Sequence, residues 1–366
     1  MTRILQIGMS DNLGGIESFI INLYRNINKE KIQFDFIDFT ENGICFKEEI
    51  EKNGGRIYKV TSRRKNIIKN KRELKNIIEK NNYKIIHIHL NTLSYITPIL
   101  VGNKIKDIKI IVHSHSQWKG KNVKTLLLDK INRLRLKKKN IICLACSEVA
   151  GNWMFKNHNY SIVNNGIDLD KILNVTSSEV KKLKSEFGIE EKDLIIGHIG
   201  SFIEVKNHEF FINFVSEFKK VFPNFKVVLV GNGSRKEYIE KTIKENKLEQ
   251  YFILTGVRND INVFVNMFDL FIMPSFYEGF PIAIVEAVAG NNICYLSDNI
   301  SKETNISDKR IRYFNLDDNL KKLIDKILND LDNKKEVNIS QLLINKGLSI
   351  KDTVDKVTNI YLDIKK

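Results

Sequence analysis

The chain has 366 residues, which suits two domains of ordinary size, and its 42% hydrophobic and 28% charged residues are typical of a globular protein. No apolar run approaches the ~20 residues that a bilayer-spanning helix needs. The net charge of +15 is unevenly placed, because residues 1–165 carry +16 and the remainder carries −1. A basic half indicates contact with a polyanion such as anionic lipid, a pyrophosphate-linked substrate or nucleic acid. Nucleic acid is disfavoured, since the basic stretches lack interleaved aromatic residues and no nucleic-acid motif is present.

The start of the chain and its cysteines are typical of a cytoplasmic protein. Residues 1–8 contain too few apolar residues for a signal peptide and predict a first strand instead. Cys143 and Cys146 form a C-x-x-C pair, but no second pair exists that could complete a zinc site. Reduced thiols are therefore expected.

Apolar runs alternate with helical patterns through the first half of the chain. The expected strands cover 4–8, 34–39, 56–60, 85–89, 108–113 and 141–145, and the clearest helical patterns cover 16–27, 67–79, 93–101 and 123–136. This alternation predicts a parallel sheet with crossover helices. The first loop contains Gly14-Gly15 but not G-x-G-x-x-G, which disfavours a dinucleotide-dependent dehydrogenase.

Two of these helical stretches carry much of the positive charge. One runs from Arg63 to Ile78, and the other covers Lys121–Asn140 and ends in a run rich in Lys and Arg. Each combines an apolar stripe with a basic face, and taken singly each fits best as a surface helix packed on its own sheet. The same pattern suits a helix lying on an anionic membrane, and the uneven charge of the chain adds weight to that interpretation for the pair.

Four histidines follow two neighbouring strands. His87 and His89 share one face of the strand 85–89, while His113 and His115 end the next strand. The carboxyl ends of parallel strands form the ligand-binding edge of a doubly wound sheet. A metal site of three or four histidines is one interpretation. No carboxylate or cysteine accompanies them at the usual spacing, so the sequence favours a site without metal.

A second alternation follows residue 165. Its expected strands cover 194–200, 226–230, 252–254, 269–273 and 293–296, with helices at 208–222 and 350–364. Lys206 stands next to a helix start, where a cation suits a phosphate ligand. Asn207 is expected to cap that helix.

The stretch 269–286 predicts a strand, a tight loop and a helix. Pro274-Ser275 ends the apolar strand, and Pro281 suits the first turn of a helix. Gly279 lets a ligand approach the backbone, and the helix N-terminus favours a phosphate. Glu278 and Glu286 can accept hydrogen bonds from sugar hydroxyls. A phosphate cradle between two such acids predicts a nucleotide-sugar site.

The same stretch resembles a known family. Glu278 and Glu286, with seven residues between them and with Met273-Pro274-Ser275 and Gly279-Phe280-Pro281 around the first, resemble the E-x7-E signature of the retaining GT-B glycosyltransferases of family 4 (group 1). The resemblance covers nearly the whole chain and is strongest over 197–289. It implies an α/β fold of the GT-B kind, in which two Rossmann-like domains with parallel sheets face each other across a cleft.

The resemblance also implies domain bounds and site residues. An acceptor-side domain would cover 1–165, a nucleotide-sugar-binding domain 166–349, and a C-terminal helix at 350–366 would cross back to the first domain. The catalytic residues would be His113, which contacts the donor sugar, Lys206, which neutralises the leaving diphosphate, and Glu278, which holds sugar hydroxyls. The donor-binding residues would be Gly14, Gly15, Ser201, Arg258, Gly279, Phe280, Pro281 and Glu286.

One position departs from the family pattern. Ser201 stands where the family's G-R-x4-K segment has Arg, so the site for the leaving group is one cation short. A cation lost from such a site weakens transition-state stabilisation. Arg258 is the substitute that the sequence offers.

The activity implied by the resemblance is transfer of a hexosyl group, with retention, from a nucleotide diphosphate sugar (a UDP-sugar) to a saccharide acceptor. The acceptor would be linked to polyprenyl pyrophosphate, as in capsular and exopolysaccharide synthesis, and the protein would be cytoplasmic and peripheral at the inner face of the membrane. No cofactor and no metal is expected. Two alternatives stay open: a nucleotide-sugar 2-epimerase on the same fold, and, because of Ser201, an inactive sugar-nucleotide-binding subunit.

Overall fold

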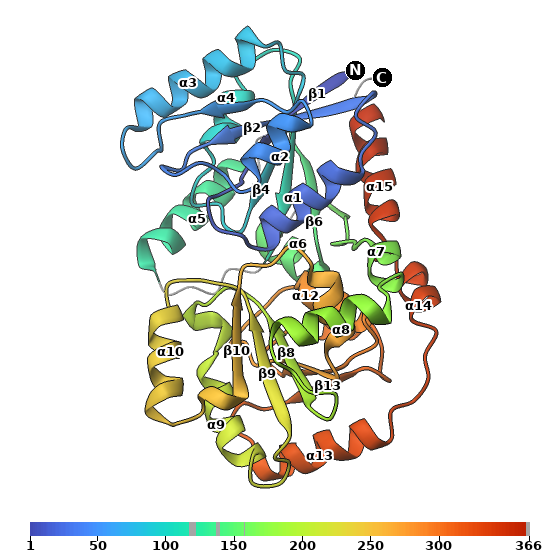
Figure 1. Cartoon of the computed structure of the whole chain (residues 1–366). Coiled ribbons are helices and arrows are strands. Elements are labelled where there is room, and N and C mark those ends of the chain that lie inside the picture. Colours follow the sequence, from blue (N-terminus) through green and yellow to red (C-terminus); the bar gives the residue numbers. More distant parts are fainter. Residues whose placement is uncertain (117–121, 137–139, 157, 364–366) are drawn as a thin grey trace. The chain divides into compact units, whose positions relative to one another are not determined.

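The computed structural model describes residues 1–116, 122–136, 140–156 and 158–363. The chain divides into two compact units (Figure 1). The N-terminal unit consists of Met1–Gly166 together with Ile350–Lys366, and the C-terminal unit consists of Ile167–Ser349. The boundaries expected from the sequence lie at 165/166 and 349/350. No helix among the described residues is both long and apolar enough to cross a membrane.

The N-terminal unit is built on a seven-stranded parallel sheet with the order β3-β2-β1-β4-β5-β6-β7. Its strands are β1 (Thr2–Ile7), β2 (Ile32–Asp38), β3 (Ile57–Lys59), β4 (Ile85–Leu90), β5 (Lys109–Ser114), β6 (Ile142–Ala145) and β7 (Ser161–Ile162). Its helices are α1 (Gly15–Asn26), α2 (Lys47–Lys52), α3 (Ile67–Lys80), α4 (Thr97–Gly102), α5 (Val123–Leu136), α6 (Glu148–Phe155) and α15 (Ile350–Asp363). All six expected strands are present, whereas the helix expected from 93 begins only at Thr97. Lys121 and residues 137–139 of the expected basic helix lie outside the described residues.

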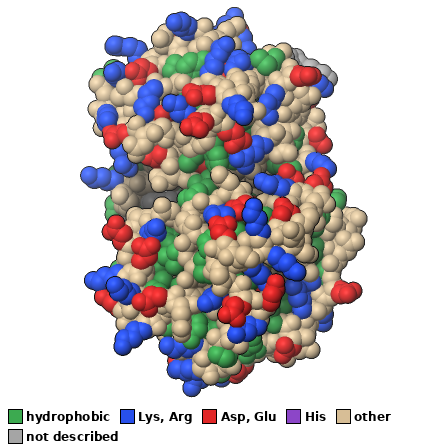
Figure 2. All heavy atoms as spheres, in the orientation of Figure 1, with side chains coloured by type: hydrophobic (Ala, Val, Ile, Leu, Met, Phe, Trp, Pro, Cys, Tyr) green, Lys and Arg blue, Asp and Glu red, His purple; other side chains and the backbone are tan. Residues whose placement is uncertain are grey.

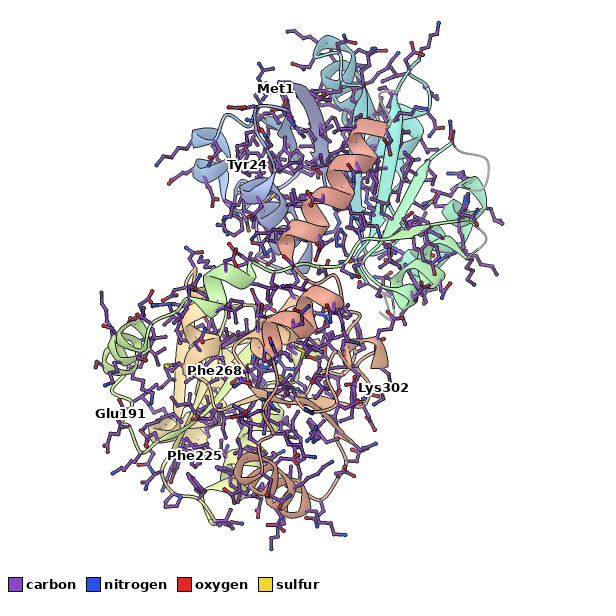
Figure 3. The ribbon with its side chains drawn as sticks, turned by 90° about the vertical axis from the view of Figure 1, so that its right-hand side faces the viewer. Met1, Tyr24, Glu191, Phe225, Phe268 and Lys302 are labelled. Carbon is purple, nitrogen blue, oxygen red and sulfur yellow. The ribbon has the colours of Figure 1, made fainter. Side chains whose placement is uncertain are left out.

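Helix α15 completes the core of the N-terminal unit, as Figure 3 shows. It packs against α1, and its residues Val357 and Tyr361 are buried. The Tyr361 ring meets the Phe34 ring edge-on, with 6.0 Å between the ring centroids. The helix expected at 350–364 is therefore present, and Val357 and Tyr361 lie on the face that it buries.

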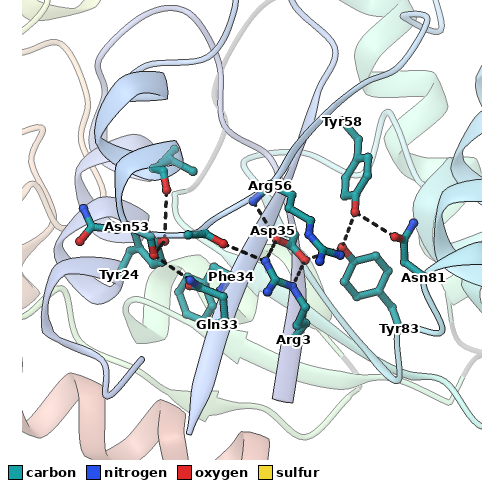
Figure 4. Close-up of polar contacts among 12 residues, drawn as sticks. Arg3, Tyr24, Gln33, Phe34, Asp35, Asn53, Arg56, Tyr58, Asn81 and Tyr83 are labelled. Carbon is teal, nitrogen blue, oxygen red and sulfur yellow. Dashed lines mark hydrogen bonds and ion pairs between the residues drawn. The ribbon is translucent and has the colours of Figure 1, made fainter. Parts of the chain in front are cut away.

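A buried ion pair joins the beginning of β1 to β2 (Figure 4). The Arg3 guanidinium donates to both oxygens of Asp35, at 2.6 and 2.5 Å, and the Asp35 side chain has no exposed surface. The hydroxyl of Tyr83 and the amide of Arg56 donate to the same carboxylate. The Asp35 carboxylate thus has several hydrogen-bond donors and a cationic partner, which is the condition under which a buried charge is tolerated.

The C-terminal unit repeats the plan with six parallel strands in the order β10-β9-β8-β11-β12-β13. Its strands are β8 (Leu194–Ile199), β9 (Phe225–Val230), β10 (Phe252–Gly256), β11 (Leu270–Met273), β12 (Ile293–Ser297) and β13 (Ile311–Phe314). Its helices are α7 (Leu169–Leu173), α8 (Ser177–Glu186), α9 (Glu209–Phe218), α10 (Lys236–Glu245), α11 (Ile261–Met267), α12 (Ile282–Ala289), α13 (Leu320–Asp332) and α14 (Ile339–Asn345), with 3-10 turns η1 (Glu204–Lys206), η2 (Glu249–Tyr251) and η3 (Lys302–Thr304).

An aromatic cluster fills the core of this unit, where Phe225 is labelled in Figure 3. Helix α9 contributes Phe210, Phe214 and Phe218, which lie four residues apart and stack in sequence along one face.

Helix α9 is shorter than the sequence predicts. Asn207 does not cap it: the Asn207 backbone has φ 52°, and its side chain donates instead to the Pro274 carbonyl at 3.1 Å.

Both sheets confirm the two Rossmann-like domains that the alternation predicted. In each, the strand order reverses beside the first strand, between β1 and β4 in one unit and between β8 and β11 in the other. Loops that leave the carboxyl ends of strands on either side of such a reversal diverge, which opens a crevice for ligands. A ligand site is therefore expected at the loops after these strands.

Candidate functional site

Two loops meet at the switch point of the C-terminal unit. One follows β8 and ends in the turn η1, and the other follows β11 and leads into α12. The Phe276 amide donates to the Val205 carbonyl at 2.8 Å, and the Asn207 side chain donates to Pro274. These two bonds tie the loops together and bring Lys206 and Glu278 to the same point.

Lys206 and Glu278 form an ion pair, with 2.5 Å between Nζ and Oε1. Their side chains are only 16% and 17% exposed. Partial burial of this kind strengthens the attraction relative to a surface pair, because less water screens the charges. The arrangement supplies one cation for a phosphate and one carboxylate for hydroxyl groups.

The backbone around Ser201 is fixed by the next turn of the sheet. Gly231 has φ +144°, and a Cβ there would lie 2.1 Å from the Gly200 carbonyl oxygen, so only glycine permits this approach. The Phe202 amide donates to the Asn232 carbonyl at 2.9 Å. Ser201 is thus held in a turn packed against the loop after β9.

Arg235 lies beside this turn and was missed by the sequence reasoning. Its amide donates to the Phe202 carbonyl at 2.9 Å, and its guanidinium pairs with Glu209. The signal was present, since Arg235 comes two residues after the turn Gly231-Asn232-Gly233, which follows a buried strand. It is a cation next to the turn that carries Ser201.

Arg258, the substitute that the sequence offered, is engaged elsewhere. It follows β10, the edge strand, and its guanidinium pairs with Glu186 at 2.8 Å and Asp260 at 2.7 Å. It borders a hollow of about 550 Å³ together with Lys171. No contact with Lys206 or Glu278 is found for it among the described residues, so it does not fill the place of the missing cation in this structure.

Glu286 occupies the middle of α12, a helix that begins at Ile282 directly after Pro281. The loop before the helix contains the buried Gly279 and the partly exposed Phe280. Desolvation raises the pKa of Glu286 to about 7, and the charge of Lys171 opposes the shift only in part. Among the described residues no hydrogen-bond donor reaches its carboxylate. A desolvated acid without a partner is suited to accept hydrogen bonds from ligand hydroxyls.

In the N-terminal unit, Gly14 and Gly15 stand at the start of α1. Glu17 in the first turn is 6% exposed and accepts hydrogen bonds from the Ser10 amide at 3.0 Å and the Ser10 hydroxyl at 2.8 Å. Burial raises the pKa of Glu17. The sequence reasoning missed this residue, although an acid in the first turn after Gly-Gly was visible. Glu17 fixes the conformation of the glycine loop through Ser10.

The four histidines gather on one face of β4 and β5, where His89 stands opposite His113 in the register. His113 has no exposed surface, and among the described residues neither of its ring nitrogens has a partner. His115 lies one residue beyond the last residue of β5 and is 8% exposed. Its Nε2 lies 2.8 Å from Nδ1 of His89. His115 is therefore nearer than His113 to the ligand-binding edge.

The same cluster is tied to other parts of the unit. His87 Nδ1 lies 2.7 Å from the Tyr361 hydroxyl, and His89 Nε2 lies 2.9 Å from the Gln6 side-chain oxygen. Burial lowers the pKa of His87 to about 3, so its ring is neutral. One nitrogen of each of His87, His89 and His113 lies within 4.8 Å of the others, and neutral imidazoles are the form that binds metals. The expectation that no metal is needed stays a prediction.

Residues 13–171 match the family described as Glycosyltransferase Family 4, and residues 179–341 match Glycosyl transferases group 1. EpsF of Bacillus subtilis (strain 168), a protein named as a glycosyltransferase, is 33% identical over 312 residues, which cover 82% of this chain and 80% of EpsF.

Two further proteins extend the comparison. The UDP-Gal:alpha-D-GlcNAc-diphosphoundecaprenol alpha-1,3-galactosyltransferase of Escherichia coli is 26% identical over 216 residues, covering 56% of this chain and 54% of that protein. The crystal structure of Anabaena Alr3699/HepE in complex with UDP superposes with a TM-score of 0.79 at 16% identity, over 99% of this chain and 100% of the other. The structural likeness shows the fold, and the sequence likeness shows the family.

Proposed function

Because this chain belongs to the group 1, family 4 glycosyltransferases, which have the GT-B fold, we propose that it transfers a hexosyl group from a UDP-sugar to a saccharide acceptor, with retention at the anomeric carbon. The observation that carries the proposal is the ion pair of Lys206 and Glu278 at a sheet switch point. Such a pair presents a cation to the donor diphosphate and an acid to the donor sugar.

The proposed roles follow from charge and position. Lys206 turns from Glu278 to the diphosphate, where it offsets the charge that grows as the sugar leaves. Glu278 is then free to accept hydrogen bonds from sugar hydroxyls. The N-terminus of α12 adds backbone N–H groups near Gly279 and Phe280, and Glu286 accepts the ribose hydroxyls. In this proposal no metal supplies the positive charge.

Two details refine the residues expected from the sequence. Arg235 adjoins the turn of Ser201, so we assign it the supporting charge that Arg258 was expected to supply. His115 is the histidine that we assign to the donor sugar, because it directly follows β5 and keeps some exposed surface, whereas the imidazole of His113 is buried completely. In this proposal, the buried ring of His113 supports the ring of His115.

The acceptor and its location rest on charge and on one relative. The N-terminal half carries the excess positive charge of the chain, and Figure 2 shows Lys and Arg side chains spread over the face of that unit. The Escherichia coli relative is named for an acceptor linked to diphosphoundecaprenol. We infer a polyprenyl-pyrophosphate-linked saccharide acceptor in capsular or exopolysaccharide synthesis, met at the inner face of the cytoplasmic membrane.

A donor panel tests the proposal. The purified chain is heated with UDP-, GDP- and ADP-sugars, and a bound donor raises the melting temperature by mass action. We expect a UDP-sugar to give the largest rise, and Glu278→Ala to remove sugar transfer to a lipid-linked acceptor. Glu217→Ala on the exposed side of α9 serves as the control. No response to any nucleotide sugar would overturn the proposal.

The same assay separates the alternatives. An epimerase converts UDP-GlcNAc without any acceptor, which proton NMR of the sugar detects. An inactive binding subunit raises its melting temperature with donor but transfers nothing to any acceptor. An α-linked product from an α-linked donor supports retention, and a β-linked product contradicts it.

A further inference from the structure

Helix α5 packs on its unit through polar residues. Asp129 and Asn132 are 6% and 5% exposed, although the helix also contains several leucines. The Asp129 carboxylate accepts the Leu93 amide at 2.7 Å, and the Asn132 side chain donates to the Leu93 carbonyl at 2.7 Å. The helix is thus fastened to the segment at Leu93 by hydrogen bonds, with Leu136 as its buried apolar residue.

The large apolar residues of α5 point outward instead. Each of the following is at least 40% exposed: Val123, Leu126, Leu127, Leu128, Ile131 and Leu134. Val123, Leu127 and Leu134 lie four and seven residues apart, so they form one continuous stripe along the helix. A contiguous apolar surface of this kind on a globular unit marks an interaction site.

The outward face also carries positive charge and no negative charge. Lys124, Lys130 and Arg135 are exposed beside the apolar stripe. Asp129, the one acid between Val123 and Leu136, is turned inward and pairs with Arg133 at 2.6 Å. Apolar side chains flanked by cations without anions are the surface chemistry that an anionic lipid bilayer recognises.

Helix α3 shows that basic composition alone does not produce this surface. It belongs to the same unit and also has 14 residues, but it buries Leu74 and Ile78 in the usual way. Two of its lysines pair with glutamates on the same helix, at 3.8 and 3.6 Å. Its Ile68 is 69% exposed and stands near the start of the helix. Helix α3 therefore provides a matched comparison.

We propose that the outward face of α5 docks into the surface of an anionic phospholipid bilayer, with its leucines in the headgroup boundary and its cations beside lipid phosphates. The inference rests on the proposed function, in which the acceptor is carried by a membrane lipid. A second copy of the same face is disfavoured as the occupant, because an isologous contact would bring like charges together. The label α5 in Figure 1 locates the helix.

Sedimentation with vesicles tests the docking. The full chain is mixed with vesicles of phosphatidylglycerol and phosphatidylethanolamine or with vesicles of phosphatidylcholine alone. We expect binding to the anionic vesicles and a decrease of at least about tenfold in affinity for Leu127→Glu, since a charge replaces an apolar group that would enter the bilayer surface. Lys130→Gln should weaken binding about fivefold, and more salt should weaken it further. Ile68→Glu on α3 should bind like the unaltered chain.

The possible outcomes distinguish failure of the docking inference from failure of the proposed function. Equal binding of Leu127→Glu and the unaltered chain overturns the inference, as does binding to neither kind of vesicle. A dimer in lipid-free solution that Leu127→Glu disperses assigns the face to a second copy instead. The thermal shift with a UDP-sugar is measured on every variant: a normal shift in Leu127→Glu shows that the variant is folded, whereas no shift in any protein contradicts the donor site alone.

Discussion

The Nζ of Lys206 lies 2.5 Å from Oε1 of Glu278, and the two residues come from loops that follow neighbouring strands of one sheet. In the ligand-free chain the two charges neutralise each other. In the proposed function, a donor diphosphate would compete with Glu278 for the lysine and would release the carboxylate for the sugar. Binding of one part of the donor would then prepare the site for the other.

This coupling predicts a non-additive pair of variants. Lys206→Ala and Glu278→Ala should each lower kcat by roughly 10²–10³-fold, because each removes a group that acts on the transferring sugar or its leaving group. The double variant should be little worse than either single one, as for residues that act together. Steady-state kinetics measures this, with Lys220→Ala and Glu217→Ala, an exposed ion pair 2.6 Å apart, as the matched set. Fully additive losses would show independent roles.

Ser201→Arg should raise activity. The substitution restores a second cation to a turn that adjoins the Lys206 loop, and an added charge at a leaving group can be worth about tenfold in kcat. Ser201→Met, which has a long side chain without charge, is the control for size. A gain in both variants, or a loss confined to Ser201→Arg, would show that the site does not lack a cation.

Glu286→Gln should change the pH dependence of donor binding. The raised pKa of about 7 means that the acid of the free protein ionises only around neutral pH, and hydrogen bonds from ribose hydroxyls favour the ionised form. Affinity for the donor should therefore increase as the pH rises through 7, with release of a proton on binding. Calorimetry in buffers of different ionisation enthalpy measures the proton. The variant should bind more weakly and without this slope.

The same substitution should stabilise the ligand-free protein in alkaline buffer. An acid whose folded pKa is raised from 4.5 to about 7 destabilises the fold as the pH rises between these values. Glu286→Gln should thus melt higher than the unaltered chain at pH 8 and nearly equally at pH 4.5. Equal melting temperatures at both pH values would show that the carboxylate is solvated.

Asp35→Ala should destabilise the N-terminal unit by about 3–5 kcal/mol, because Arg3 and Tyr83 lose a fully buried partner. Glu49→Ala removes an acid that pairs with Arg25 on the surface of the same unit and should cost about 0–1 kcal/mol. Urea unfolding measures both. A small loss for Asp35→Ala would mean that water replaces the carboxylate.

Acid should destabilise the N-terminal unit as the pH falls from 6.5 toward 3. Burial lowers the pKa of both His87 and His115 to about 3, against 6.5 for a solvated imidazole. The unfolded chain therefore binds protons that the folded chain refuses, and the stability present above pH 6.5 is lost as the pH falls toward 3. His87→Asn should reduce the slope of unfolding free energy against pH by about one proton. An unchanged slope would show that this ring is protonated in the folded state.

The sequence predicted the sheets well, because buried parallel strands are continuous apolar runs that need no partner to be recognised. It missed β7 and β13, which have two and four residues at the edges of their sheets. The loop of Glu278 could be proposed as a site from the sequence because its glycine, prolines and acids are close together in the chain. The role expected for Arg258 stays a prediction. Its ion pair with Glu186 could not be predicted, because pairing between distant residues is not visible in a local sequence pattern.

Helix α5 illustrates a different limit. Its amphipathic pattern was visible, but periodicity states only that a helix has two faces and not which face its own domain buries. The buried face is decided by two hydrogen bonds at Leu93, whose amide donates to Asp129 and whose carbonyl accepts from Asn132, and these join residues 36 and 39 positions apart. Only the tertiary structure therefore shows which face of α5 its own unit buries.

The hydroxyl of Tyr361 accepts a hydrogen bond from the Gln6 side chain, although 355 positions separate the two residues. The same hydroxyl is within hydrogen-bond distance of Nδ1 of His87. During synthesis the sheet of the N-terminal unit leaves the ribosome first, yet its core stays open until the whole C-terminal unit has been made. The apolar surface that α15 later covers therefore stays exposed on the nascent chain for the time needed to add about 200 residues. The N-terminal unit can therefore complete its fold only after the C-terminal unit has been synthesised. A truncated or stalled chain exposes the apolar face that α15 covers, and chaperones and proteases can bind it.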